Sequence, residues 1–206
     1  MEQHPDDHLQ LKKRFINHWR QYRHDLLNQM QLVKSYYQLG RMDDMMRCID
    51  QFVVRVQQES LLSKLDDPEL VYMLLTYNYE SHPLYLDIEL TLSHEEMEAI
   101  ANQKSWFNMV KELVSLMEKG CKPGQNQPLP HFSLVLERHA DELSLSAELQ
   151  GGWDTAVGSH IMERLREKVT IQQGKLVEYN HHNHGVMFEI RMPWPESTAA
   201  RHSPGY

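Results

Sequence analysis

Residues 15–37, with the sequence FINHWRQYRHDLLNQMQLVKSYY, decide the fold of the N-terminal part of this chain. Apolar side chains recur there in steps of three and four, which is the spacing of one packed face of a helix. This apolar stripe comprises Phe15, Trp19, Tyr22, Leu26, Met30, Val33 and Tyr37. His24 lies outside the stripe, because two residues of an α-helix turn through about 200°. We therefore expect a polar helix face that carries an imidazole, opposite a face that packs.

Three polar residues share the face of His24 at helical spacings: Arg20 lies four residues before it, and Asn28 and Gln31 lie four and seven residues after it. The surrounding segment, Leu9 to Leu39, holds six basic residues against a single acid, whereas the whole chain has a net charge of −8. A basic helix on an acidic protein predicts a partner with an acidic surface, attracted by opposite charge. A single exposed histidine is more often a solvated residue than a reactive one, so the neighbouring pattern has to carry the assignment.

A helical hairpin is expected from the turn signals around this segment. The first helix spans residues 9–39, and Gly40 is suited to end it in the left-handed conformation. Asp43 or Asp44 can cap a second helix that continues to about Leu65. Two helices with apolar seams cannot enclose those seams alone, whereas two hairpins form a four-helix bundle. The sequence therefore predicts a homodimer.

The second half of the chain alternates between helical and strand periods, so the fold class expected for the whole chain is α+β. The expected elements are a helix over 68–80, a strand over 84–90, a long helix from a Ser93–Glu96 capping box to Lys119, strands over 131–138 and 142–149, a helix over 156–169, and strands over 173–180 and 185–192. The expected domains are a helical hairpin over 1–66, an α/β domain over 67–192 and a flexible tail over 193–206.

Composition narrows the function classes. An apolar content of 41% is sufficient for a packed core, and the acidic N-terminus and the short apolar runs predict neither secretion nor a membrane partner. Cys48 and Cys121 have no metal-type or redox-type spacing, so reduced thiols of a cytoplasmic protein are expected. The negative net charge argues against nucleic acid as a partner.

The run Arg23-His24-Asp25, followed by Asn28 and Gln31, resembles the phosphoacceptor helix of the sporulation initiation phosphotransferase B family. It is also similar to the helix of sensor kinases that carries an HxxxN pattern. The resemblance implies that His24 accepts a phosphoryl group from an aspartate of one response regulator and passes it to a second one. Arg23, Asp25 and Asn28 would then support His24. Arg20 and Gln31 would contact the regulator, whose acidic pocket would supply Mg²⁺.

A histidine kinase shares this plan, so the residues of the second half have to decide whether an ATP site is expected. Such kinases carry asparagines in a helix that aligns with residues 106–119, followed by DxGxG and GxGxG loops. Glu112 and Leu116 occupy the asparagine positions, Asn108 lies one turn too early, and neither loop motif occurs. Gly151-Gly152 is interpreted as a strand-to-helix turn. We expect no nucleotide, metal or other cofactor in this chain, and a domain that resembles a degenerate kinase ATP-binding domain.

Three alternatives remain open at this point. The chain could be a non-catalytic dimeric module that sequesters a response regulator or a histidine kinase. It could be an unusual autokinase with degenerate nucleotide loops. His181, His182 and His184 could bind Zn²⁺ or Ni²⁺, although they lie in a polar turn and no fourth ligand with a regular spacing accompanies them.

Overall fold

The computed structural model describes residues 5–124, 128–182 and 185–195 and divides the chain into two compact units, Met1–Gln57 and Gln58–Tyr206. The division falls within helix α2 (Met42–Leu62), earlier than the boundary expected after residue 66. Leu62 and Leu65 explain the difference, because both side chains are buried in the core of the second unit. Within the described ranges, no helix is both long enough and apolar enough to cross a membrane.

The first unit contains α1 (Pro5–Gln38), the turn after it and most of α2. Gly40 adopts a left-handed φ of +70°, as its position at the helix end predicted. The Arg41 N–H closes the turn by donating to the Tyr36 carbonyl at 2.9 Å. Asp44 accepts from Arg41 and Arg47, and these hydrogen bonds lower the pKa of its carboxyl group. The reversal between the two helices is therefore fixed by local contacts.

The second unit is built on a five-stranded mixed sheet with the order β1-β2-β3-β5-β4. Its strands are β1 (Tyr85–Leu90), β2 (His131–His139), β3 (Glu142–Gln150), β4 (Lys175–His182) and β5 (Gly185–Pro193). β1 pairs with β2 in parallel, and the other pairs are antiparallel. The α+β class expected from the sequence is confirmed.

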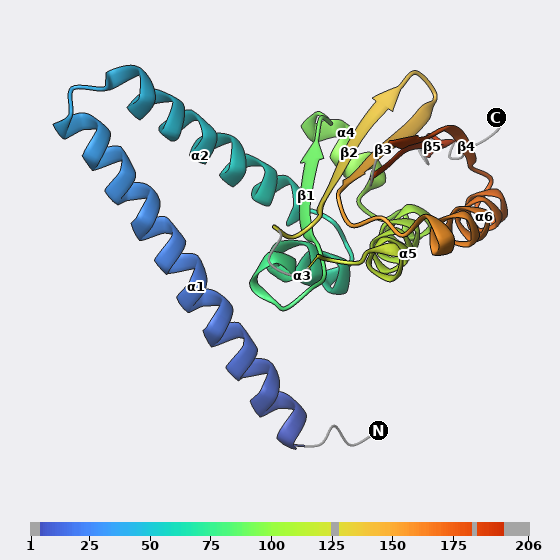
Figure 1. Ribbon diagram of the computed structural model, residues 1–206, viewed down its shortest axis with the longest axis horizontal. Helices are drawn as coiled ribbons and strands as arrows, with labels where there is room; N and C mark the ends of the chain where they lie inside the picture. Colours follow the sequence, from blue (N-terminus) through green and yellow to red (C-terminus); the bar gives the residue numbers. More distant parts are fainter. Residues whose placement is uncertain (1–4, 125–127, 183–184, 196–206) are drawn as a thin grey trace, which may run out of the picture. The chain divides into compact units, whose positions relative to one another are not determined.

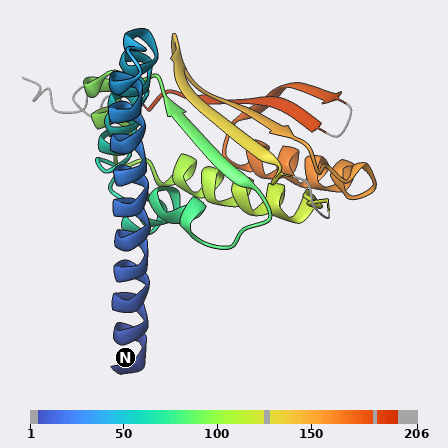
Figure 2. The same ribbon diagram turned by 60° about the vertical axis from the view of Figure 1, so that its left-hand side comes forward.

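Helices cover one face of this sheet and leave the other open, as Figures 1 and 2 show for α5 and α6. The helices of this unit are α3 (Pro68–Thr76), the short 3₁₀ helix η1 (Tyr77–Tyr79), α4 (His94–Ile100), α5 (Lys104–Gly120) and α6 (Thr155–Ile171). The core lies between the layers, where Phe107 and Leu113 of α5 meet Phe132 and Phe188 of the sheet, all of them fully buried. Hydrophobic burial of this kind supplies most of the stability of such a layered domain.

The single long helix expected from Ser93 to Lys119 is wrong, because two helices occupy this segment. The capping box itself is present, with Ser93 and Glu96 bonded reciprocally. The helix ends at Ile100 because tertiary partners use the carbonyls that would continue it. The indole of Trp106 donates to the Ile100 carbonyl at 3.2 Å, and the Asp66 N–H donates to the Ala101 carbonyl at 2.8 Å.

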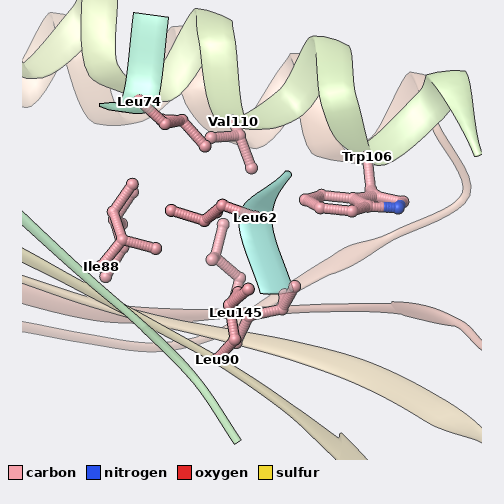
Figure 3. Close-up of a pocket in the computed structure, with 9 residues that line it drawn as sticks. Leu62, Leu74, Ile88, Leu90, Trp106, Val110 and Leu145 are labelled. Atoms are coloured by element: carbon pink, nitrogen blue, oxygen red, sulfur yellow. The ribbon is translucent and has the colours of Figure 1, made fainter. Parts of the chain in front are cut away.

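A small apolar cavity lies inside the second unit, between the helical layer and the sheet (Figure 3). Its lining residues are Leu62, Leu74, Ile88, Leu90, Trp106, Val110, Leu134, Leu136 and Leu145. Every one of these side chains is hydrophobic, and a dry apolar void offers no group that could orient a polar ligand. We therefore assign it to core packing.

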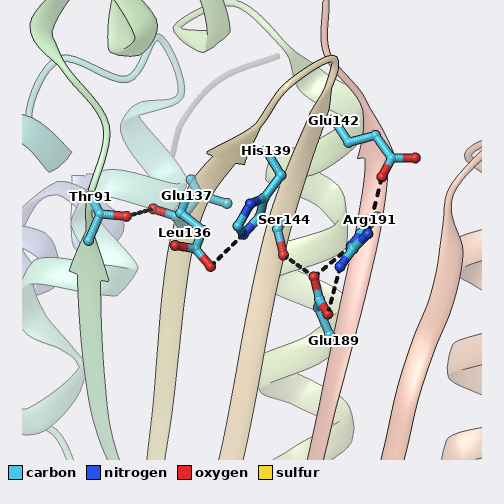
Figure 4. Close-up of polar contacts among 8 residues, drawn as sticks. All are labelled: Thr91, Leu136, Glu137, His139, Glu142, Ser144, Glu189 and Arg191. Carbon is cyan, nitrogen blue, oxygen red and sulfur yellow. Dashed lines mark hydrogen bonds and ion pairs between the residues drawn. The ribbon is translucent and has the colours of Figure 1, made fainter.

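The open face of the sheet carries a polar network (Figure 4). The Glu189 carboxylate accepts from Ser144 at 2.6 Å and from Arg191 at 2.7 Å, and the hydrogen bond from Arg191 is the main reason that the pKa of Glu189 is lowered. Lys175 pairs with Glu142 at 2.7 Å. These contacts join β3, β5 and β4 across the solvent side of the sheet.

Pro193 and Trp194, which the sequence placed in the tail, take part in the fold. Pro193 ends β5, and the Trp194 N–H donates to the Asp141 carbonyl at 2.8 Å. The guanidinium of Arg138 lies 4.4 Å from the centre of the Trp194 ring, within the range of a cation–π contact. Residues 196–206 of the expected tail lie outside the described residues.

Candidate functional site

The candidate site is the polar face of α1 around His24. The His24 side chain is 73% exposed, and two described residues, Asn28 and Asp25, approach the same nitrogen of its ring. The Asn28 Nδ2 atom lies 3.1 Å from His24 Nδ1, and Asp25 Oδ1 lies 3.6 Å from the same nitrogen. Across the described ranges, no side chain or backbone group bonds to Nε2. The ring is therefore held at one nitrogen and open to solvent at the other.

Helix geometry explains this arrangement. Asn28 is four residues after His24, so the two side chains lie one turn apart on the same face. Asp25 is rotated by about 100° and reaches the ring only from the side. The contacts need no other element of the chain, because all three residues belong to α1.

The other residues expected at the site are exposed on α1 but are not in contact with the imidazole. Arg20 directs its Nη1 atom toward Asn17 Oδ1, at 3.5 Å. Gln31 is exposed, and its backbone carbonyl accepts from the Ser35 hydroxyl. Arg23 is exposed beside the histidine. The chain thus brings Asn28 and Asp25 to His24 and leaves Arg20, Arg23 and Gln31 available to a partner.

The apolar stripe of the same helix remains largely uncovered within this chain. Phe15 is 63% exposed and Tyr37 is 62% exposed, and the exposed set continues along both helices of the first unit. Its other large members are Leu9, Leu11, Ile16, Trp19, Leu27, Met30, Leu32, Leu39, Met42, Met46, Val53, Val54 and Val56. An apolar surface of this extent on a soluble monomer is uncommon and marks a protein or membrane contact.

The positions that align with the kinase asparagines have other partners in the second unit. The Glu112 carboxylate lies 3.7 Å from both Arg164 and Lys168 of α6. Leu116 is buried in the core, and Asn108 is exposed. Glu112 thus helps to hold α5 against α6.

The Gly151-Gly152 turn is held by backbone hydrogen bonds to the end of α5. Both glycines have positive φ angles, +82° and +63°. The Lys122 N–H donates to the Gly152 carbonyl at 2.6 Å, and the Asp154 N–H donates to the Gly120 carbonyl at 3.0 Å. The interpretation as a strand-to-helix turn agrees with this geometry.

Trp153 is the residue of this turn whose role the sequence did not reveal. Its side chain is buried between two glycines, Gly120 at the end of α5 and Gly158 in the first turn of α6. A Cβ atom at Gly120 would lie 2.4 Å from the indole, and one at Gly158 would lie 2.6 Å from it. The two glycines therefore provide the space that Trp153 fills between the helices.

The histidine-rich turn gives no further information on a metal. His184 lies outside the described residues, and the description of His181 and His182 is limited to their backbone in β4. In the part of the chain that the structure describes, no three His, Cys, Asp or Glu side chains are grouped so that they could hold a metal ion. Cys48 is half-buried and Cys121 is buried, and burial raises the pKa of the Cys121 thiol to about 11.

Comparison with solved structures finds low overall similarity to histidine kinases. The Acinetobacter baumannii histidine kinase AdeS is 12% identical, with a TM-score of 0.43 over 83% of this chain and 98% of that chain. The catalytic domain of histidine kinase ThkA is also 12% identical, with a TM-score of 0.41 over 66% of this chain and 94% of that chain.

Sequence comparison gives a more specific result. Residues 10–65 match the model of the family described as "Sensor_kinase_SpoOB-type, alpha-helical domain". The chain is 25% identical over 158 residues to Sporulation initiation phosphotransferase B of Bacillus subtilis (strain 168), covering 76% of this chain and 81% of the relative. The resemblance to the sporulation initiation phosphotransferase B family is thus confirmed, and its alpha-helical domain corresponds to residues 10–65 of this chain.

Proposed function

We propose that this protein is a phosphorelay phosphotransferase of sporulation initiation, and that His24 carries the phosphoryl group. Similarity to Sporulation initiation phosphotransferase B supports a phosphotransfer function in general. The observation that carries the specific assignment is the geometry of His24: an exposed imidazole with Nδ1 held by Asn28 and Asp25 and with Nε2 facing solvent. Phosphoryl transfer requires mainly positioning and charge stabilisation, which such a site can provide.

The proposed transfer consists of two successive displacements at phosphorus. The lone pair of His24 Nε2 attacks the aspartyl phosphate of a response regulator, the N–P bond forms, and the regulator's aspartate leaves as a carboxylate. The aspartate of a second regulator then attacks the phosphohistidine, and the imidazole leaves. Mg²⁺ bound in the regulator would offset the charge on the phosphoryl oxygens. This chain would contribute the nucleophile and its orientation.

Asn28 and Asp25 would select the reactive tautomer of the ring. Attack through Nε2 requires the proton to be on Nδ1, where a hydrogen-bond acceptor holds it. The nitrogen and oxygen of an Asn amide exchange places on a half-turn, so the side chain of Asn28 can present its oxygen to Nδ1 from its present position. The Asp25 carboxylate, 3.6 Å from Nδ1, would stabilise the positive charge that the ring acquires during attack.

The regulator would dock on the basic surface of α1. Six exposed basic side chains lie on this helix, and Asp25 is the single acid among its residues 9–38; the basic residues are Lys12, Lys13, Arg14, Arg20, Arg23 and Lys34. An acidic phosphorylation pocket would be attracted to this surface, and Arg20, Arg23 and Gln31 are placed to contact it. The association rate should therefore fall as the salt concentration rises.

The exposed apolar surface of the first unit would be covered by a second copy of the chain. Phe15, Trp19, Met30 and Tyr37 belong to the stripe expected from the sequence, and all four are more than 40% exposed. Two hairpins packed through these stripes would give a four-helix bundle with His24 on its outer surface. The proposed active form is therefore a homodimer.

The test is transfer of labelled phosphate from a phosphorylated response regulator, in parallel with ATP and Mg²⁺. We expect acid-labile label on the wild type from the regulator alone, none on His24→Ala, and normal labelling of His160→Ala, which removes an exposed histidine of α6. Full labelling of His24→Ala would refute the assignment. Label from ATP would identify an autokinase, and regulator binding without transfer would identify a sequestering module.

A further inference from the structure

The strand β1 lies at one edge of the sheet, with β2 on its inner side. Backbone bonds show which of its peptide groups face outward. The Tyr85 N–H donates to Pro130 and the Thr91 N–H donates to Leu136, so the odd-numbered residues face β2. Because peptide groups alternate along a strand, Leu86, Ile88 and Leu90 direct their N–H and C=O groups to the free edge. A free edge of this kind is a template for another strand.

Gln58 of α2 covers the C-terminal end of this edge. The Leu90 N–H donates to Gln58 Oε1 at 2.7 Å, and Gln58 Nε2 donates to the Leu90 carbonyl at 3.2 Å. A carboxamide has the same donor and acceptor as a peptide group. Gln58 therefore makes both hydrogen bonds that a neighbouring strand would make with Leu90.

Asn78 of η1 covers the N-terminal end in the same way. The Leu86 N–H donates to Asn78 Oδ1 at 2.9 Å, and Asn78 Nδ2 donates to the Leu86 carbonyl at 2.6 Å. Gln58 and Asn78 are far apart in sequence and belong to different elements, yet each engages one outward residue of the same strand. Only Ile88 lies between the two covered positions on that edge.

The opposite edge of the sheet, formed by β4, is irregular. The register of β4 against β5 shifts between Leu176 and Glu178, and Lys175 is exposed at the start of β4. A bulge and a lysine are two common means by which a sheet avoids edge-to-edge pairing. β1 is more regular, since its pairing with β2 runs in continuous register over the whole strand.

We propose that Gln58 and Asn78 form an edge guard, which prevents β1 from pairing with the corresponding strand of a second copy. The partner that the guard excludes is another β1, because backbone pairing of two equivalent edges requires no complementary side chains and closes as a symmetric dimer. Leu86 and Leu90 are buried on the core side, which keeps the strand in place when the guard is removed. This inference concerns the second unit and does not depend on the role of His24.

The guard is tested with the double variant Gln58→Leu, Asn78→Leu. Its matched control is Gln57→Leu, Asn108→Leu, which makes the same exchanges at exposed positions of α2 and α5. Two properties are measured in the full-length protein: hydrogen exchange at the Leu86 and Leu90 amides, and mass by sedimentation. At dilutions where the double variant keeps the wild-type mass, we expect exchange at both amides to rise by about tenfold, the effect of losing one net hydrogen bond. At higher concentrations we expect its mass to exceed that of the wild type and both amides to regain protection, because pairing of two β1 strands bonds the same N–H groups again. The control should match the wild type in both.

A third variant distinguishes loss of the edge guard from a general loss of folding. Gln58→Glu retains an acceptor for the Leu90 N–H but loses the donor to the Leu90 carbonyl, and it places a charge at the edge. Protection at Leu90 and the wild-type mass should both persist. Unchanged exchange in the double variant at low concentration would overturn the assignment of Gln58 and Asn78 as the groups that protect these two amides. Faster exchange at low concentration without a rise in mass at higher concentration, or an equal rise in mass in the control, would overturn their role as a guard.

Discussion

The exchange of Gly158 for alanine tests the packing of Trp153 most directly, because local preference and tertiary structure predict opposite results. Gly158 lies in α6, where alanine is favoured over glycine by about 1 kcal/mol. In the folded protein, however, a Cβ atom at this position would lie 2.6 Å from Cε2, Cζ2 and Nε1 of Trp153. Non-bonded carbon atoms prefer separations of about 3.5–4.0 Å, so the indole or the helix must move.

The expected change in the free energy of unfolding follows from the helix preference for alanine and from the opposing steric overlap with Trp153. Adding a methyl group to a well-packed interior typically costs about 1–3 kcal/mol. Trp153 cannot yield easily, since another part of its ring also lies close to Gly120, where a Cβ atom would be 2.4 Å from Cζ3. We therefore take the upper part of this range, about 2–3 kcal/mol, and subtract about 1 kcal/mol for the helix preference, so the free energy of unfolding of the second unit should fall by about 1–2 kcal/mol.

The assay is urea unfolding of the full-length protein, followed by tryptophan fluorescence and by circular dichroism. Ser159→Ala is the control, because it changes an exposed neighbour in the same helix and should leave stability within about 0.5 kcal/mol of the wild type. In a Trp153→Leu background, Gly158→Ala should cost much less, since the smaller side chain leaves space for the methyl group. Equal or greater stability of Gly158→Ala in the wild-type background would refute the packing argument.

Two further changes test the first unit and the sheet. Leu26→Asp should lower the sedimentation mass from that of a dimer to that of a single chain, because it places a carboxylate in the apolar stripe. Gln21→Asp, on the polar face of the same helix, should leave the mass unchanged. A dimeric Leu26→Asp would contradict the proposed bundle. Hydrogen bonds from Arg191 and Ser144 lower the pKa of Glu189. The stability that this carboxylate contributes is therefore present above the ordinary pKa of 4.5 and is lost as the pH falls through the lowered pKa of the folded protein. Urea unfolding at neutral pH and below pH 4.5 should therefore show a smaller loss of stability in Glu189→Gln than in the wild type; equal losses would contradict this role of Glu189.

The sequence by itself determined the features that depend on neighbouring residues. The spacing of apolar residues gave the helices and strands, because each side chain's direction follows from its local conformation. The end of α1 at Gly40 and the capping box at Ser93 were predictable for the same reason, and both are present. The contact between His24 and Asn28 also belongs to this group, because residues four apart on a helix are neighbours whatever the rest of the chain does.

Only the tertiary structure decided the features that join residues distant in sequence. The break after Ile100 depends on the indole of Trp106 and on the Asp66 N–H, which compete with the helix for its carbonyl groups. Two further contacts could not be predicted from the residues around them. Trp153 packs against Gly120 and Gly158, and Gln58 bonds to the edge of β1. Such contacts form only when the packing of the layers brings separate segments together, since the hydrophobic free energy that drives this packing is not directional and does not specify partners.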